Sequence, residues 1–410
     1  MAIFTKLFQA VRTWRTRKHS TIDLFWEVCY QLIAIFCFAL GYLCLTAIRP
    51  FKEVRIGFLE AGALGHLALN LDLFFRRKQL GIFPINALYI FFVYNAANRQ
   101  LLKMYSREVT IFESRHIGRL FSLFAILNTR FYQRLDMSSN EYCEYQKTYC
   151  QIAFTQAERT LGRLSLLNMG IKDDDWFVCI FARDPIHYKK VYGYLESPMT
   201  FRDSDIDTYV EAAKFIVEQG GYVLRMGMDV EKRFAFQHER VIDYALSHRS
   251  DFMDVYLTAN CKIYIGTASG GSDMARIFDK FHLALNWTLV GWAPGGKNEI
   301  YMPKTLCNRR TGKQVKYEEA LSLTSKWIIS LDFNVEKALV DIEAELVSNS
   351  PQQILAATKE LMERVSGTYV ESVGYRDRLN VYFRLRHQHN NWCKNVYTPI
   401  ASNYLESLNI

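Results

Sequence analysis

Two short glycine-bearing turns are the first candidates for a binding site. One is Gly62-Ala-Leu-Gly65-His66, and the other runs from Gly266 to Asp273 (GTASGGSD). Glycine lets a backbone approach a ligand closely, and the start of a helix offers free N–H groups and a positive dipole to a phosphate. Neither turn has the lysine of a Walker loop or the spacing of a dinucleotide fingerprint. We expect both to be anion sites, the second being richer in hydroxyl donors; a tight turn or a well-capped helix is the alternative.

Two arginines come at the ends of apolar runs that are typical of buried strands. Arg183 follows Trp176–Ala182, and Arg225 interrupts Tyr222–Gly227. A planar guanidinium suits a diphosphate, and a charge inside a parallel sheet needs a ligand or a buried carboxylate. We expect Arg183 to bind an anion, with a plain surface ion pair as the alternative, and Asp184 either to orient it or to cap the next turn.

Acid–base and metal chemistry have fewer candidates. His66 adds a titratable group to the first turn. Asp203, Asp205 and Asp207 have the DxD spacing that holds a metal in some enzymes, but they precede a predicted helix, so capping is the preferred interpretation. The nine cysteines form no CxxC pair and the histidines have no metal-ligand spacing. We expect no metal site, and cysteines that serve as small apolar residues in a reducing compartment.

Strands and helices alternate along two stretches of chain, which indicates parallel α/β sheets with ligand sites at the carboxyl ends of the strands. In the first stretch we predict strands at 53–59, 88–94 and 109–112 and helices at 66–78 and 98–107. In the second we predict strands at 176–182, 222–226, 262–266 and 282–289 and helices at 208–219, 251–259, 269–280, 318–326, 335–347 and 351–365. The expected divisions are 1–50, 51–170, 171–366 and a C-terminal tail at 367–410.

The first 50 residues stand apart from these units. The chain has 410 residues, half of them apolar, and a formal charge of +8, which excludes a disordered or collagen-like protein. An uncharged run, Val28–Ile48, follows a basic arm that extends from Lys6 to Lys18. Its length suits a membrane core of about 30 Å, with a buried core helix or a signal peptide as weaker alternatives. We expect a membrane-associating helix that is re-entrant or monotopic, with the basic arm on anionic lipid at the cytoplasmic face.

Several longer segments together resemble a family of bacterial glycosyltransferases found with surface-polysaccharide genes, such as those for capsule or lipopolysaccharide. They are VRIGFLEAGALGHLALNLDLFFRR, FVCIFARD, RDSDIDTYVEAAKFIVEQGGYVLRMG, RSDFMDVYLTANCKIYIGTASGGSD and NWTLVGWAPGGKNEIYMPKTLCNRRTGKQVKYEEAL. The strand–GALGH–helix turn is also similar to the start of bacterial heptosyltransferases. Arg183 matches by position an arginine motif of protein O-fucosyltransferases, although the preceding His and doubled Arg of that motif are missing here.

The resemblance implies a GT-B-like α/β fold, with two Rossmann-like domains that face a cleft. It implies that the second domain binds a nucleotide-sugar donor and that the first binds a glycan or polyprenyl-linked acceptor. The implied donor-binding residues are Arg183, Arg225, Gly227, Thr267, Ser269, Gly270, Gly271, Ser272 and Asp273. The implied acceptor-side loop contains Gly62, Gly65, His66 and Asn70.

In the implied reaction His66 is the first candidate for general base, with Glu60 and Asp72 as alternatives, and Arg183 stabilises the leaving diphosphate. No cofactor or metal is expected, and the nucleotide-sugar is a substrate. The competing hypothesis is a catalytically inactive scaffold of a polysaccharide-assembly complex. An NAD-type oxidoreductase is disfavoured because a GxGxxG fingerprint with its acidic ribose ligand is missing, and no basic face interleaved with aromatic residues suggests nucleic-acid binding.

Overall fold

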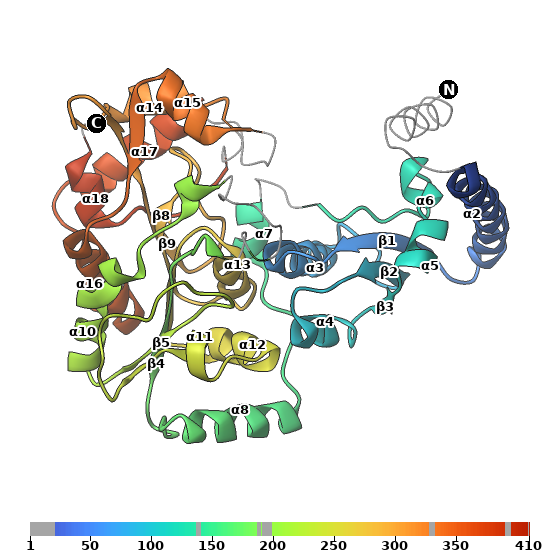
Figure 1. Cartoon of the computed structure of the whole chain (residues 1–410), viewed down its shortest axis with the longest axis horizontal. Helices are drawn as coiled ribbons and strands as arrows, with labels where there is room; N and C mark the ends of the chain where they lie inside the picture. The colour runs from blue at the N-terminus through green and yellow to red at the C-terminus, as the bar shows by residue number, and fades with distance from the viewer. Residues whose placement is uncertain are drawn as a thin grey trace.

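Two parallel sheets form the framework of the protein (Figure 1). The computed structural model describes residues 21–136, 141–186, 190, 199–327, 333–389, 395–408 and 410. The predicted basic arm lies outside these residues. The α/β class with parallel sheets, which the alternating pattern predicted, is confirmed.

The first sheet has the strand order β1-β2-β3, with all pairs parallel. Its strands are β1 (Val54–Glu60), β2 (Leu88–Tyr94) and β3 (Thr110–Glu113). Side chains alternate between the two faces of a strand. One face carries Leu59, Phe91 and Val93 into a core with the helices that follow β1 and β2, and the other carries Ile56 and Phe92 into a separate aromatic cluster. The helices around this sheet are α3 (Leu64–Gln79), α4 (Arg99–Tyr105), α5 (Arg115–Leu120), α6 (Leu123–Ile126) and α7 (Glu141–Lys147).

The second sheet has six parallel strands in the order β6-β5-β4-β7-β8-β9. It follows α8 (Gln156–Asn168), whose start is fixed by a capping box between Thr155 and Glu158. The strands are β4 (Phe177–Phe181), β5 (Tyr222–Arg225), β6 (Val241–Ile242), β7 (Ile263–Gly266), β8 (His282–Trp287) and β9 (Glu299–Pro303). Short runs of buried apolar residues fit central strands that are covered on both faces.

Helices cover both faces of the second sheet (Figure 1). They are η1 (Thr200–Arg202), η2 (Ile206–Tyr209), α10 (Val210–Glu218), α11 (Tyr244–Ser247), α12 (Asp251–Asn260), α13 (Gly270–Ile277), α14 (Tyr317–Thr324), α15 (Val335–Asp341) and α16 (Pro351–Ser366). The helix predicted at 335–347 was wrong in its second half. Glu343 has a φ of 52°, which ends α15, and β11 (Ala344–Val347) then pairs antiparallel with β10 (Thr305–Asn308).

We call the first sheet with its helices the first unit, and the second sheet with its helices the second unit. The last described segment of the chain packs on the second unit. It forms α17 (Tyr375–His389) and α18 (Ser402–Ser407). Tyr382, Ile400 and Leu405 are fully buried in the same core as the second sheet. The described part of 367–410 is therefore folded against the second unit.

The two units share a packed boundary made of helices. Met274 and Ile277 of α13 and Val255 of α12 lie in the same apolar cluster as the core side of α3. Arg76 of α3, which is fully buried, donates to the backbone oxygen of Ile277 at 3.0 Å and to Asp279 at 3.0 Å. Guanidinium bonds of this kind fix the position of α3 relative to α13 because each lost bond would leave a buried charge unsatisfied.

Candidate functional site

The two glycine-bearing turns, far apart in the sequence, meet at this boundary. The first turn leads from β1 into α3, and the second leads from β7 into α13. A Cβ atom added to Gly270 would lie 2.7 Å from the backbone nitrogen of Gly65, and one added to Gly65 would lie 2.6 Å from Oδ2 of Asp273. The two helix N-termini therefore pack backbone against backbone, which only glycine permits here.

The two helix starts differ in how their N–H groups are satisfied. Ser269 caps α13 and accepts a hydrogen bond from the Ser272 nitrogen, while the Ser272 hydroxyl donates to the Thr267 oxygen at 2.7 Å. Ala63, at the N-cap of α3, provides no side-chain bond. The capped-helix interpretation is thus confirmed for the second turn. The first turn of α3, in contrast, keeps N–H groups that a helix cannot satisfy internally.

Three cations lie at the carboxyl ends of the second sheet beside the second turn. Arg183, directly after β4, has its backbone nitrogen bonded to the Thr267 hydroxyl at 3.0 Å. Arg202 donates to the Ala268 oxygen at 2.6 Å. Lys304, directly after β9, donates to the Asp203 oxygen at 2.7 Å. We call Arg183, Arg202 and Lys304 the cation cluster.

Two members of the cation cluster are buried, and Arg202 is partly exposed. Arg183 and Lys304 are each 5% exposed. The guanidinium of Arg183 bonds to the Asp203 carboxylate and to the Met199 oxygen at 2.9 Å, so Arg183 does form an ion pair, but the pair is mostly buried and not at the surface. Burial, with a smaller contribution from the charge of Arg183, lowers the pKa of Lys304 to about 8. A bound anion would relieve this destabilisation of the charged form.

Sequence reasoning missed Arg202 and Lys304, although both had a weak signal. Lys304 directly follows the apolar run EIYMP, and Arg202 stands in the run that contains the DxD residues. Lys304 could have been found by the argument used for Arg183, a cation at the end of an apolar run. The run EIYMP was not predicted as a strand, so its carboxyl end was not searched.

On the first unit, His66 and Glu60 form an exposed pair at the carboxyl end of β1. Nδ1 of His66 lies 3.3 Å from Oε2 of Glu60, with 43% and 80% of the side chains exposed. A carboxylate at Nδ1 fixes the orientation of the ring and leaves Nε2 for a proton of another group. His66 immediately follows Gly65, so this pair borders the junction of α3 and α13.

Asp72, the remaining alternative for the base, does not fit that role. It is 2% exposed and bonds to Nε of Arg76 at 2.7 Å. Burial raises the pKa of Asp72 to about 6 despite the neighbouring Arg76 charge. Asp72 therefore belongs to the buried contact between the units. Asn70 of the predicted acceptor-side loop is likewise buried, inside α3.

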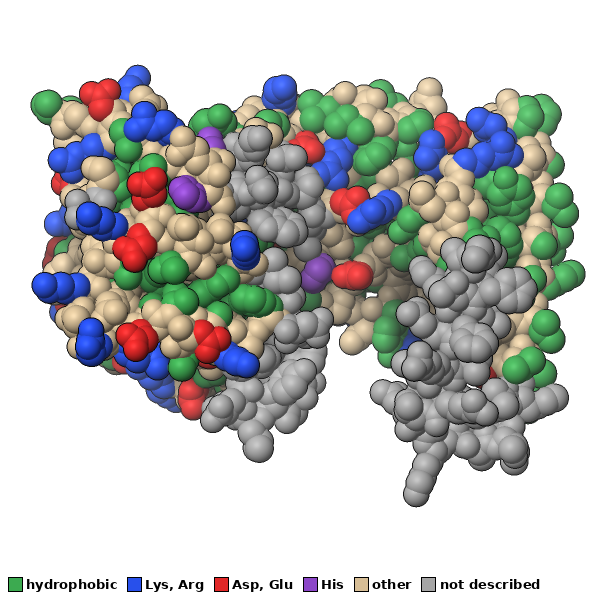
Figure 2. All heavy atoms as spheres, turned by 90° about the horizontal axis from the view of Figure 1, so that it is seen from above, with side chains coloured by type: hydrophobic (Ala, Val, Ile, Leu, Met, Phe, Trp, Pro, Cys, Tyr) green, Lys and Arg blue, Asp and Glu red, His purple; other side chains and the backbone are tan. Residues whose placement is uncertain are grey.

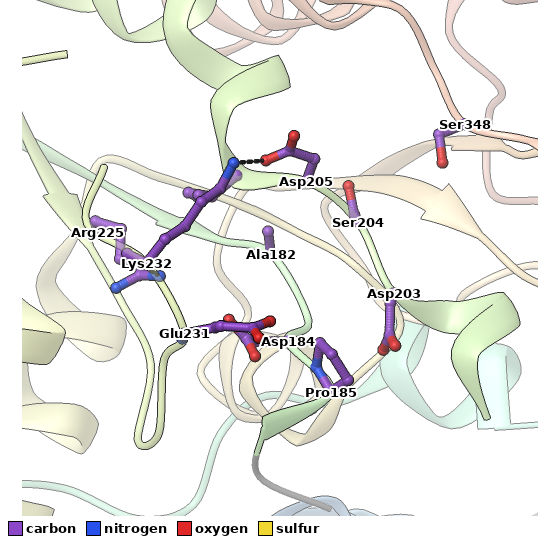
Figure 3. Close-up of a pocket in the computed structure, with 11 residues that line it drawn as sticks. Ala182, Asp184, Pro185, Asp203, Ser204, Asp205, Arg225, Glu231, Lys232 and Ser348 are labelled. Atoms are coloured by element: carbon purple, nitrogen blue, oxygen red, sulfur yellow. Dashed lines mark hydrogen bonds and ion pairs between the residues drawn. The ribbon is translucent and has the colours of Figure 1, made fainter. Parts of the chain in front are cut away.

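Arg225, Asp203 and Asp205 line a cavity of about 430 Å³ at the ends of β4 and β5 (Figure 3). Arg225 pairs with Asp243 at 3.1 Å, so a carboxylate does accompany this buried strand arginine as expected, although Asp243 is only partly buried. Asp205 caps η2 as expected and also pairs with Lys232, as Figure 3 shows. Gly227 has a φ of 157° and approaches Val230 too closely for a side chain.

Asp273 links the junction to a buried charge network. It pairs with Arg276 at 3.2 Å, and Arg276 in turn bonds to Glu299 at 3.1 Å. Glu299 also contacts Nδ1 of His282 at 2.9 Å, and its pKa is lowered to about 2 by Arg276 and His282 against the effect of burial. Among the described residues, no group of three or more His, Cys, Asp or Glu is arranged to hold a metal ion.

The chain is similar in structure to several solved glycosyltransferases, at low sequence identity. A glycosyl transferase family 9 protein of Veillonella parvula is 12% identical with a TM-score of 0.40, covering 71% of this chain and 97% of its own. The ADP-heptose lipopolysaccharide heptosyltransferase II of E. coli is 12% identical with a TM-score of 0.40, and the match covers 76% of this chain and 98% of the heptosyltransferase. The E. coli heptosyltransferase WaaC with ADP-2-deoxy-2-fluoro heptose is 12% identical with a TM-score of 0.35, covering 61% and 93%. No family model and no curated protein matches the chain.

Proposed function

We propose that the protein is a membrane-associated glycosyltransferase of GT-B-like arrangement. It transfers a sugar from a nucleoside-diphosphate sugar to a lipid-linked glycan acceptor, in the synthesis of a bacterial surface polysaccharide. The observation that carries this proposal is the position of the cation cluster beside the α13 N-terminus, with His66 and Glu60 across the same junction.

In this reaction the bond from the anomeric carbon to the diphosphate breaks, and a bond to the acceptor oxygen forms. The leaving diphosphate gains negative charge, which buried cations and helix N–H groups stabilise more strongly than water can. Lys304 and Arg202 supply the positive charge for this, beside the N-terminus of α13. His66 takes the proton of the acceptor hydroxyl on Nε2, while Glu60 stabilises the resulting imidazolium from the Nδ1 side.

One observation favours the second candidate, the inactive scaffold. Arg183 and Arg225, the two arginines that the sequence assigns to the donor, each already pair with a carboxylate, Asp203 and Asp243. A scaffold would retain such pairs for stability alone. The two candidates differ in whether the cation cluster binds a nucleotide.

The deciding experiment measures nucleotide binding to the full-length protein by calorimetry and thermal shift, with UDP, GDP, CMP and ADP and their sugar conjugates. We expect one nucleotide class to bind the wild type and Lys214→Met, a control at a half-exposed lysine of the same unit. Lys304→Met should lose that binding. His66→Gln should retain it but lose about 10²–10⁴-fold in turnover, as removal of a general base does. Binding of no nucleotide at all would support the scaffold, and wild-type binding by Lys304→Met would refute the donor site.

A further inference from the structure

The helix α2 (Thr21–Ile48) exposes a continuous apolar face on the outside of the first unit. Its segment Trp26–Ile48 has a mean hydropathy of 2.2. Only 6% of the 18-residue window within it that gives this value is buried. Leu32, Phe36 and Leu43 are 61%, 67% and 66% exposed and recur at helical spacing. Figure 2 shows hydrophobic side chains gathered along this edge of the molecule, at the end opposite the second unit. So little of α2 is buried that the alternative of a buried core helix does not fit it.

The opposite face of α2 is attached to the folded unit along its length. Phe38 packs edge-on against Phe124 with ring centroids 4.9 Å apart, and Tyr42 against Phe131 at 5.3 Å. A Cβ atom added to Gly41 would lie 3.4 Å from the ring of Phe121 and 3.5 Å from that of Phe124, so the helix backbone lies close to both rings. These contacts bury one stripe of the helix in the aromatic cluster on the outer face of the first sheet.

Polar contacts fasten both ends of the same helix. Near its start, Arg119 of α5 pairs with Glu27 at 2.6 Å and lies over the Tyr30 ring. Near its end, Arg130 donates to the Thr46 hydroxyl at 3.1 Å. From Glu27 to Thr46 the helix extends about 28 Å, which is close to the thickness of a bilayer core. The unit therefore lies beside α2 over a full membrane thickness.

These contacts between α2 and the first unit limit how α2 can lie relative to a membrane. If α2 spanned a bilayer, α5, α6 and the turn that follows α6 would lie beside it at membrane depth, where lipid-facing backbone groups outside a helix or a closed barrel cannot be satisfied. We propose that α2 instead lies in the plane of an anionic phospholipid surface, with Leu32, Phe36 and Leu43 in the acyl boundary and the opposite stripe on the protein.

The chemistry at the end of α2 favours lipid over a second copy of the chain. Arg49 and Lys52 directly follow the helix and are exposed, so positive charge stands where anionic headgroups would lie. Two copies meeting through this face would place those same cations close together in a parallel pair. The inference rests on the membrane association proposed above, and it is independent of the reaction.

The test measures the depth of labels on full-length protein reconstituted in vesicles of phosphatidylethanolamine and phosphatidylglycerol. A bimane label is placed at Leu32→Cys, Phe36→Cys or Leu43→Cys, with the reactive native cysteines changed to serine, and is quenched by lipids brominated at shallow or deep positions. We expect one common shallow depth of about 5–10 Å at all three sites. Leu161→Cys on α8, an exposed apolar position outside this face, should stay unquenched.

Each other outcome overturns the proposal in a distinct way. A spanning helix would place Phe36 close to the bilayer centre and Leu32 and Leu43 each about 8 Å from it in opposite leaflets, so the Phe36 label would be much deeper than the other two. No quenching at any site would refute membrane association itself. Protection of all three labels from lipid, with energy transfer between differently labelled chains, would identify a second copy as the occupant. None of these readings depends on whether the protein transfers a sugar.

Discussion

Replacing Gly270 with alanine tests whether the two helix N-termini meet as closely as the structure indicates. The added Cβ would lie 2.7 Å from the nitrogen of Gly65 and 2.8 Å from Cβ of Leu64. The nearest of these atoms belongs to the backbone of the other unit, so no side-chain rotation can relieve the contact. α3 and α13 must move apart.

The size of the effect follows from the distance. Ordinary van der Waals contact begins near 3.4 Å, so the helices must separate by about 0.7 Å. Overpacking of this kind costs about 1–3 kcal/mol, and the better helix propensity of alanine returns at most about 1 kcal/mol. We expect Tm to fall by roughly 1 °C for each kcal/mol of net loss in a chain of 410 residues. Misplacement of binding groups by about 1 Å can lower turnover as much as 10²-fold, so transfer should fall as well.

The assay compares Gly270→Ala with Gly62→Ala by calorimetric melting and by transfer to acceptor. Gly62 is the matched control because an added Cβ there meets only the Asn95 oxygen, at 3.8 Å. We expect Gly62→Ala to melt as the wild type does. Wild-type stability and turnover in Gly270→Ala would show that the close approach of the two turns, and the site built on it, is wrong.

Two further predictions concern charge. Because the folded pKa of Lys304 is lowered to about 8 and a bound diphosphate would raise it, donor binding takes up a proton, and Kd should rise by up to about tenfold per pH unit above pH 8. Calorimetric titrations from pH 7 to 9.5 measure this, and Lys214→Met should show the same pH dependence as the wild type. Asp72→Asn removes a buried charged partner of Arg76, so urea titration should show a loss of up to about 3–5 kcal/mol. Unchanged stability with lost transfer would restore Asp72 as the base.

The parallel sheets were predictable because their signals are local. The run predicted as a strand at 53–59 is β1 at Val54–Glu60, and the one at 88–94 is β2. Each is a short apolar run next to a turn residue, followed by an amphipathic helix, and burial on both faces of a parallel sheet selects that composition. The prediction of a helix at 335–347 was wrong from Glu343 onward, because this residue adopts a left-handed φ that glutamate rarely adopts and that the sequence therefore does not indicate.

The site was predictable only in pieces. Each turn alone fits a capped helix, and it is the contact between Gly65 and Gly270 that brings them to one place. That contact depends on how α3 packs against α13, which no local pattern encodes. The pairing of His66 with Glu60 is local, since Glu60 ends β1 and His66 lies in the first turn of α3, and the sequence did indicate both as candidates for the base.

Arg183 shows how the structure changes the choice of experiment. From the sequence, its removal looks like a clean test of donor binding. In the structure its guanidinium holds Asp203 and the Met199 oxygen, so Arg183→Ala would leave a mostly buried carboxylate without its partner and destabilise the loop that carries Arg202. Lost activity in that variant could not be assigned to the donor site. Lys304 bonds to a backbone oxygen instead, so its removal strands no charge, and the effect on binding can be separated from the effect on folding.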